Sequence, residues 1–163
     1  MSQNVFDVIV IGAGPGGYVA AIRCAQLGLK TAIIEREHMG GICLNWGCIP
    51  TKAMLRSAEI FHLMHRANEF GLSAEKISFD LDTVIKRSRG ISKQLNQGVT
   101  HLLKKNKVKS FIGEATILEK GKIKVLKEKK SEELLTDNII IASGARAREL
   151  PGLEADGEIV WTY

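Results

Sequence analysis

One glycine-rich turn near the N-terminus limits the fold of this chain more than any other stretch of its sequence. The turn reads Gly12-Ala13-Gly14-Pro15-Gly16-Gly17. It follows a short apolar run, residues 5–11, and precedes a helical pattern that extends to about Leu27. A second apolar run, residues 31–35, comes next. Because both runs have the length and β-branched composition of buried parallel strands, this region predicts one βαβ unit.

The glycines match the pattern G-x-G-x-x-G and have separate tasks in that unit. Gly12 permits a tight turn, Gly14 lets the backbone approach a pyrophosphate, and Gly17 lets helix and strand pack closely. The helix N-terminus, with Pro15 in its first turn, offers N–H groups to phosphates. Glu35 is placed to accept hydrogen bonds from ribose hydroxyls and would repel a 2′-phosphate. We predict a site for FAD or NAD rather than NADP; the alternative is a glycine turn with a solvent-facing glutamate.

A pair of cysteines follows this unit in a second glycine-rich run. The run reads Gly40-Gly41-Ile42-Cys43-Leu44-Asn45-Trp46-Gly47-Cys48-Ile49-Pro50-Thr51-Lys52. The pair has three interpretations: a redox-active disulfide, metal ligands, or inert thiols. An iron–sulfur site of plant type would need a cysteine where Thr51 stands, and the histidines give no standard zinc spacing, so we expect no metal.

The position of Cys48 favours the redox interpretation. It lies just before a predicted helix start, where the helix dipole favours a thiolate. The third cysteine, Cys24, lies inside the first helix among alanines and fits an inert buried thiol.

The rest of the chain predicts two long helices and then short strands. The helices span about 50–70, with Gly71 as a cap, and about 82–106. Their apolar residues recur at helical spacing and are expected to pack in the core: Met54, Leu55, Ala58, Phe61, Leu63 and Met64 in the first, and Val84, Ile85, Ile91, Leu95, Val99, Leu102 and Leu103 in the second. An antiparallel meander is expected at about 107–137, from strands at 108–112, 115–118, 122–127 and 133–136. Residues 138–142 predict a strand that returns to the parallel sheet.

Composition excludes several classes of protein. The chain has 163 residues, of which 45% are hydrophobic, and this is enough for one buried core. The net charge of +5 comes from lysines that are spread along the sequence, so no nucleic-acid partner is expected. No apolar stretch reaches the length of a membrane span, and no signal peptide is visible. We expect a cytoplasmic protein; a mature organellar form would have the same features.

The cysteine run resembles the active-site segment of a known family, the pyridine nucleotide–disulfide oxidoreductases. The residues that carry the resemblance are Gly41, Cys43, Asn45, Gly47, Cys48, Pro50 and Lys52. The resemblance implies an α/β fold: a Rossmann-like FAD-binding domain with a parallel sheet, long helices and a small antiparallel β-meander. Residues 1–163 would form a single partial FAD-binding domain, with the meander inserted and the NAD and interface domains absent.

The resemblance also implies that FAD occupies the first nucleotide site, with Glu35 on its adenosine ribose. Lys52 would lie near the flavin, and the backbone of Ala115 would meet the adenine. Ser143 and Gly144 match an Ala-Thr-Gly turn that closes over FAD, with Ser in place of Thr. The residues assigned to the cofactor are Gly12, Gly14, Pro15, Gly17, Glu35, Arg36, Gly40, Gly41, Cys43, Lys52, Ala115, Ser143 and Gly144.

Within the family, the segments around Leu44 and Ile49 are most similar to the members that oxidise dihydrolipoyl groups. The implied reaction is oxidation of a protein-bound dihydrolipoyl group by NAD through a Cys43–Cys48 disulfide and FAD. A reductase for glutathione or mercuric ion is the alternative. The implied partners are the lipoyl-bearing acyltransferase components of 2-oxoacid dehydrogenase complexes and a second copy in a homodimer. Because no second G-x-G-x-x-G follows, we expect this polypeptide to be an N-terminal fragment that is inactive alone.

Two rival classes stay open from the residues alone. A nicotinamide-dependent dehydrogenase with a single Rossmann domain would explain the glycines and Glu35 but would leave the cysteines without a role. An interaction module would use the lysine-rich segment, 120–130, to contact a large complex.

Overall fold

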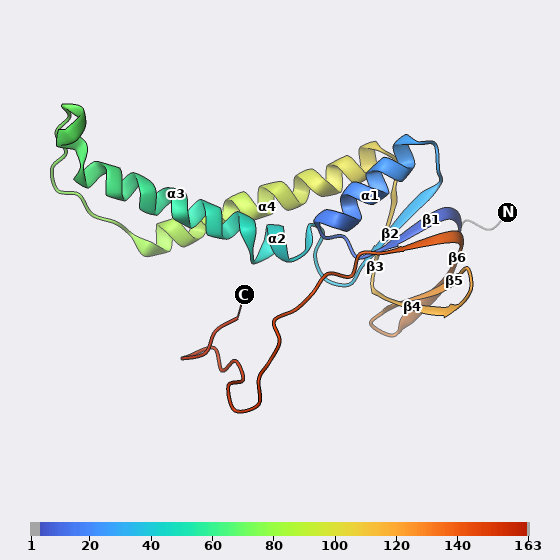
Figure 1. Cartoon of the computed structure of the whole chain (residues 1–163). Coiled ribbons are helices and arrows are strands. Elements are labelled where there is room, and N and C mark those ends of the chain that lie inside the picture. The colour runs from blue at the N-terminus through green and yellow to red at the C-terminus, as the bar shows by residue number, and fades with distance from the viewer. Residues whose placement is uncertain (1–3, 163) are drawn as a thin grey trace.

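The computed structural model describes residues 4–162 of the chain, which form a six-stranded mixed sheet with helices (Figure 1). The strand order is β3-β2-β1-β6-β5-β4. The first four strands in that order are parallel, and the last three form an antiparallel meander that shares β6. The strands are β1 (Val5–Ile11), β2 (Thr31–Glu35), β3 (Lys109–Ile112), β4 (Glu114–Glu119), β5 (Lys122–Lys127) and β6 (Lys130–Ile141). The predicted fold class is confirmed.

The helices begin and end close to the predicted positions. They are α1 (Pro15–Gln26), α2 (Gly41–Asn45), α3 (Cys48–His65) and α4 (Leu81–Lys105), with a short 3₁₀ helix, η1 (Ala67–Phe70). Asp80 caps α4, because its carboxylate accepts hydrogen bonds from the N–H groups of Asp82 and Thr83. None of the helices among residues 4–162 is long and apolar enough to cross a membrane.

The alternation of side chains along the parallel strands divides the core into two layers. On one face, Val8 and Val10 pack with Ala21 of α1 and with Val99 and Leu103 of α4. The opposite face packs against the meander. The buried residues of this second layer come from both the parallel strands and the meander: Phe6, Ile9, Ala32, Ile34, Phe111, Ile123, Val125 and Leu134. The meander therefore takes the place that a second layer of helices would occupy.

Two strand predictions were wrong. Residues 109–112 do not belong to the meander but form β3, which pairs in parallel with β2. The strands predicted at 133–136 and 138–142 are one continuous strand, β6, which pairs with β5 over its first half and with β1 over its second. β6 continues through Asp137 and Asn138: the side-chain amide of Asn138 donates to the Asp7 carbonyl, and Asn138 pairs with Val8 of β1.

The predicted core packing of α3 was also wrong. Its stripe residues Leu55, Leu63 and Met64 are exposed, Leu55 to 62%. On α4 only Val99 and Leu103 of the predicted stripe are buried. The reason is visible in Figure 1: α3 and the first half of α4 form a hairpin that extends beyond the sheet, so only the second half of α4 reaches the core.

We predict that Gly17→Ala destabilises the protein, although alanine is the better helix former. A Cβ at Gly17 would lie 1.8 Å from the Gly12 carbonyl oxygen, so α1 would have to move off the turn. We expect a loss of about 2–4 kcal/mol in urea unfolding. Gly16→Ala is the matched control: a Cβ there has nothing within 4 Å, and stability should hold or rise. Equal stability of the two variants would contradict the close packing.

Candidate functional site

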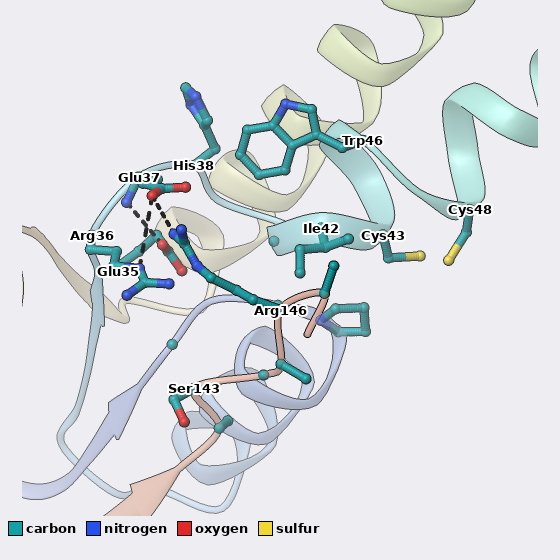
Figure 2. A pocket seen from close by; sticks show the side chains of 18 of the residues that line it. Glu35, Arg36, Glu37, His38, Ile42, Cys43, Trp46, Cys48, Ser143 and Arg146 are labelled. Atoms are coloured by element: carbon teal, nitrogen blue, oxygen red, sulfur yellow. Dashed lines mark hydrogen bonds and ion pairs between the residues drawn. The ribbon is translucent and has the colours of Figure 1, made fainter. Parts of the chain in front are cut away.

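A cavity of about 740 Å³ lies at the carboxyl ends of β1, β2 and β6 (Figure 2). Ligands of parallel α/β sheets bind at this edge, and the volume suits a small-molecule or cofactor site. The cavity extends from the acidic end of β2 to the two cysteines. Its lining residues are Gly12, Gly14, Pro15, Glu35, Arg36, Glu37, His38, Gly41, Ile42, Cys43, Trp46, Cys48, Ala142, Ser143, Gly144, Ala145, Arg146, Ala147, Glu149 and Thr162.

The first glycine turn forms one wall of this cavity. Gly12 has a φ of +98°, and a Cβ there would lie 2.2 Å from the Ala142 carbonyl oxygen, so only glycine fits. Gly14 is the N-cap of α1 and has no side chain to cap the first turn. A Cβ on Gly14 would meet nothing within 4 Å, and Gly14 lines the cavity. The uncapped N-terminus of α1 therefore suits an anionic group such as a pyrophosphate.

The carboxylate of Glu35 is held in place by two backbone amides. It accepts hydrogen bonds from the N–H groups of Ala13, at 2.8 Å, and Glu37, at 2.9 Å. Each oxygen keeps a lone pair that can accept a further hydrogen bond, for example from a hydroxyl. The ribose contact that we predict for Glu35 is compatible with this arrangement.

The second glycine turn rests directly on the first. The N–H of Gly40 donates to the Ala13 carbonyl at 2.8 Å. Gly41 has a φ of +59°, and a Cβ there would lie 2.7 Å from the Gly14 Cα. The cysteine run is therefore attached to the nucleotide turn at positions that only glycine can occupy.

The two cysteines lie at one end of the cavity and come from different helices. Cys43 is in α2, in a segment that was predicted as loop, and Cys48 is the first residue of α3. Their side chains point toward one another (Figure 2). The neighbouring Cys48 thiol raises the pKa of Cys43 by hydrogen bonding to it; burial adds to this, and the charge of Lys52 opposes it.

Ten of the predicted site residues line the cavity, and four do not. Gly17 and Gly40 are buried within the turns. Lys52 is exposed in the first turn of α3, where its charge acts on Cys43. Ala115 lies on β4 and packs against the second core layer. No group of residues in the described part of the chain is arranged to hold a metal ion.

The other ten lining residues were not predicted from the sequence, and four of them make contacts with one another at the cavity. Arg146 donates from Nη2 to Glu37 Oε1 at 2.7 Å, and this ion pair joins the loops after β6 and β2. Glu37 follows β2 and Arg146 follows β6, so their opposite charges could have predicted this ion pair from the sequence. The rings of His38 and Trp46 lie 5.3 Å apart, and no spacing in the sequence indicates that contact.

Comparisons with known proteins agree with this geometry. The sequence profile of the family described as pyridine nucleotide-disulphide oxidoreductase matches residues 6–163. The chain belongs to this family.

Curated relatives and solved structures are similar over nearly the whole chain. A dihydrolipoyl dehydrogenase of Zymomonas mobilis is 54% identical over 97% of this chain and 34% of its own length. A dihydrolipoyl dehydrogenase of Bacillus subtilis is 45% identical over 96% of this chain and 35% of its own length. The crystal structure of LpdA from Mycobacterium tuberculosis superposes with a TM-score of 0.82 at 26% identity, over 94% of this chain and 35% of LpdA. The chain thus spans about a third of the length of these proteins.

We predict that Cys48→Ala lowers the pKa of Cys43, because the largest cause of its elevation is removed. The pH of half-maximal alkylation of Cys43 by iodoacetamide should move down, as measured by mass spectrometry of the Cys43 peptide. Lys52→Gln should move it up, because a nearby positive charge is lost. Cys24→Ala is the control and should leave it unchanged. An unchanged midpoint in Cys48→Ala would show that the two thiols do not interact.

Proposed function

We propose that this chain supplies the FAD site and the redox-active dithiol of a dihydrolipoyl dehydrogenase. That enzyme oxidises protein-bound dihydrolipoyl groups with NAD. One observation carries the proposal: the facing cysteines lie in the same cavity as the uncapped N-terminus of α1 and the carboxylate of Glu35. The curated relatives named dihydrolipoyl dehydrogenase support the choice within the family.

The residues of the cavity fit an elongated dinucleotide such as FAD. The pyrophosphate would lie at the N-terminus of α1 beside Gly14, and the ribose would lie at Glu35. Gly41 and Ser143 would line the path toward the cysteines. When bound, FAD supplies an acceptor for the electron pair of the reduced dithiol and passes it to NAD.

The cysteines themselves carry out thiol–disulfide exchange. A substrate thiolate attacks the Cys43 sulfur, the Cys43–Cys48 bond breaks, and Cys48 leaves as a thiolate. The second substrate thiolate then attacks the substrate sulfur bonded to Cys43, and Cys43 leaves. The substrate dithiol becomes a cyclic disulfide and is oxidised, the protein disulfide is reduced to a dithiol, and the two substrate thiols give up their protons.

The remaining parts of the proposal concern the whole protein. Residues 1–163 form part of an FAD-binding domain, while NAD and interface domains lie elsewhere in the complete enzyme. The partners are lipoyl-bearing acyltransferase components of 2-oxoacid dehydrogenase complexes and a second copy of the enzyme, in the cytoplasm. The length of the curated relatives, about three times that of this chain, supports the further domains. The partners and the compartment follow from the proposed reaction and from the bacterial origin of those relatives.

Replacement of either cysteine in the complete enzyme should abolish turnover of dihydrolipoamide with NAD. We expect Cys43→Ser and Cys48→Ser to lower kcat at least about 1,000-fold, since each removes one sulfur of the exchange. NADH formation measures the rate. Cys24→Ser is the matched control, because Cys24 packs in the core away from the cavity and should leave kcat unchanged. Undiminished turnover in Cys43→Ser would favour a dehydrogenase that does not use the cysteines, and faster use of glutathione disulfide or mercuric ion would favour another reductase.

Gly14→Val should weaken flavin binding without unfolding the protein. The valine side chain would enter open space, at an N-cap with ordinary extended backbone, and would fill the place of the pyrophosphate. We expect the affinity for FAD to fall at least about tenfold, measured by quenching of flavin fluorescence, with an unchanged melting temperature. Gly16→Ala serves as the control. Retained affinity in Gly14→Val would place the cofactor elsewhere.

A further inference from the structure

The separation of the two cysteine sulfurs depends on how α2 and α3 are held relative to one another. Cys43 lies on α2 and Cys48 begins α3, and only Trp46 and Gly47 lie between the helices. α2 is five residues long and cannot keep its orientation by its own hydrogen bonds. α4 runs along both helices and provides the external support (Figure 1).

Arg89 of α4 is bonded to the end of α2. Its Nη1 donates to the backbone carbonyl of Asn45 at 2.7 Å. Asn45 is the last residue of α2, and the carbonyls at a helix end have no partner within the helix. The guanidinium satisfies this carbonyl with a charge-assisted hydrogen bond and places a positive charge at the negative end of the helix.

Arg87, two residues earlier on α4, makes the corresponding bond to α3. Its Nη1 donates to the backbone carbonyl of Ala53 at 2.8 Å and lies 3.4 Å from the hydroxyl of Ser57. Ala53 is buried at the junction of α3 with α4 and lies five residues after Cys48. We call Arg87 and Arg89 the arginine bracket, because together they attach both cysteine-bearing helices to one support.

A pair of asparagines holds the other end of α2. Asn45 Nδ2 donates to the carbonyls of Gly41, at 2.8 Å, and Met39, at 3.1 Å. Asn96 of α4 donates from Nδ2 to the Met39 carbonyl and to Asn45 Oδ1. The Met39 carbonyl and the Asn45 side chain are therefore held independently of Arg89. Loss of Arg89 should free the Asn45 backbone carbonyl while α2 stays attached to α4.

We propose that Arg89 is a positioning residue for the dithiol, with Arg87 as its counterpart on α3. The arginine bracket holds α2 and α3 so that the Cys43 and Cys48 thiols, which are free in this structure, face one another where a disulfide would join them. This inference rests on the proposed function, because it takes the pair as redox-active. The bracket and the disulfide impose the same constraint, so each stabilises the other, and loss of the bracket favours the open dithiol.

The test is a thiol–disulfide titration of the purified protein in glutathione buffers, in a Cys24→Ala background. One glutathione disulfide oxidises the protein dithiol: the protein S–S bond forms, the glutathione S–S bond breaks, and two protons pass to two glutathione thiols. The equilibrium constant is read by alkylation and mass spectrometry and requires neither FAD nor substrate. We expect Arg89→Gln to lower this constant about five- to tenfold, the scale of one intramolecular hydrogen bond. Arg87→Gln should lower it in the same direction.

Lys86→Gln is the matched control, since it removes one positive charge from the same helix. Within residues 4–162, Lys86 makes no hydrogen bond to α2 or α3. Its constant should equal that of the unmutated protein, and Arg89→Lys should restore only part of the loss, because an ammonium group cannot keep the guanidinium geometry. Thermal unfolding checks that each variant is folded. If Arg89→Gln does not fold, the equilibrium constant of Arg87→Gln tests the inference in its place.

Three results would overturn the inference. Equal constants for Arg89→Gln and the unmutated protein would show that the bond does not position the pair. Equal shifts in Arg89→Gln and Lys86→Gln would show a general effect of charge. A pair that stays reduced in the unmutated protein at every glutathione ratio would overturn the proposed function and this inference together, whereas either of the first two results overturns the inference alone.

Discussion

The contact between the two glycine turns is the constraint on which the rest of the site depends. Gly41 lies against Gly14 so closely that a Cβ could not be added, and the Gly40 N–H is bonded to the Ala13 carbonyl. This contact places the cysteine run beside the N-terminus of α1, at the carboxyl end of β1. A nucleotide held by the helix N-terminus would therefore extend toward the sulfurs, and the chain needs no separate element to bring the two together.

The cavity is completed by a segment that is distant in sequence. β6 runs from the meander into the parallel sheet beside β1, and its end brings Ala142 over Gly12 and carries Arg146 to Glu37. The walls thus come from three strand ends that only the parallel pairing aligns. The bonds from backbone amides to Glu35 fix its carboxylate, while the Arg146–Glu37 pair is exposed and contributes little stability by itself.

The helical hairpin shows where reasoning from periodicity fails. α3 and α4 have apolar residues at helical spacing, and both were predicted to be buried. Only Val99 and Leu103, near the end of α4, reach the sheet, whereas Leu55 of α3 is exposed. Spacing predicts a helix and its apolar face, but burial depends on what lies opposite that face. The contacts of α4 with the cysteine-bearing helices include polar ones: Arg87 and Arg89 donate hydrogen bonds to backbone carbonyls of α3 and α2.

The sequence alone determined the βαβ unit, the approximate limits of the long helices and the nucleotide turn. It also gave the hypothesis that Cys43 and Cys48 are a redox-active pair. These features depend on residues within a few positions of one another, where glycine conformation, strand composition and helix capping act directly. Tertiary structure decided that β6 is a single strand, that α3 is exposed, and that Arg146 meets Glu37 across 109 positions of the chain. Those outcomes arise from pairing between distant segments, whose energy is set by geometry that no local pattern encodes.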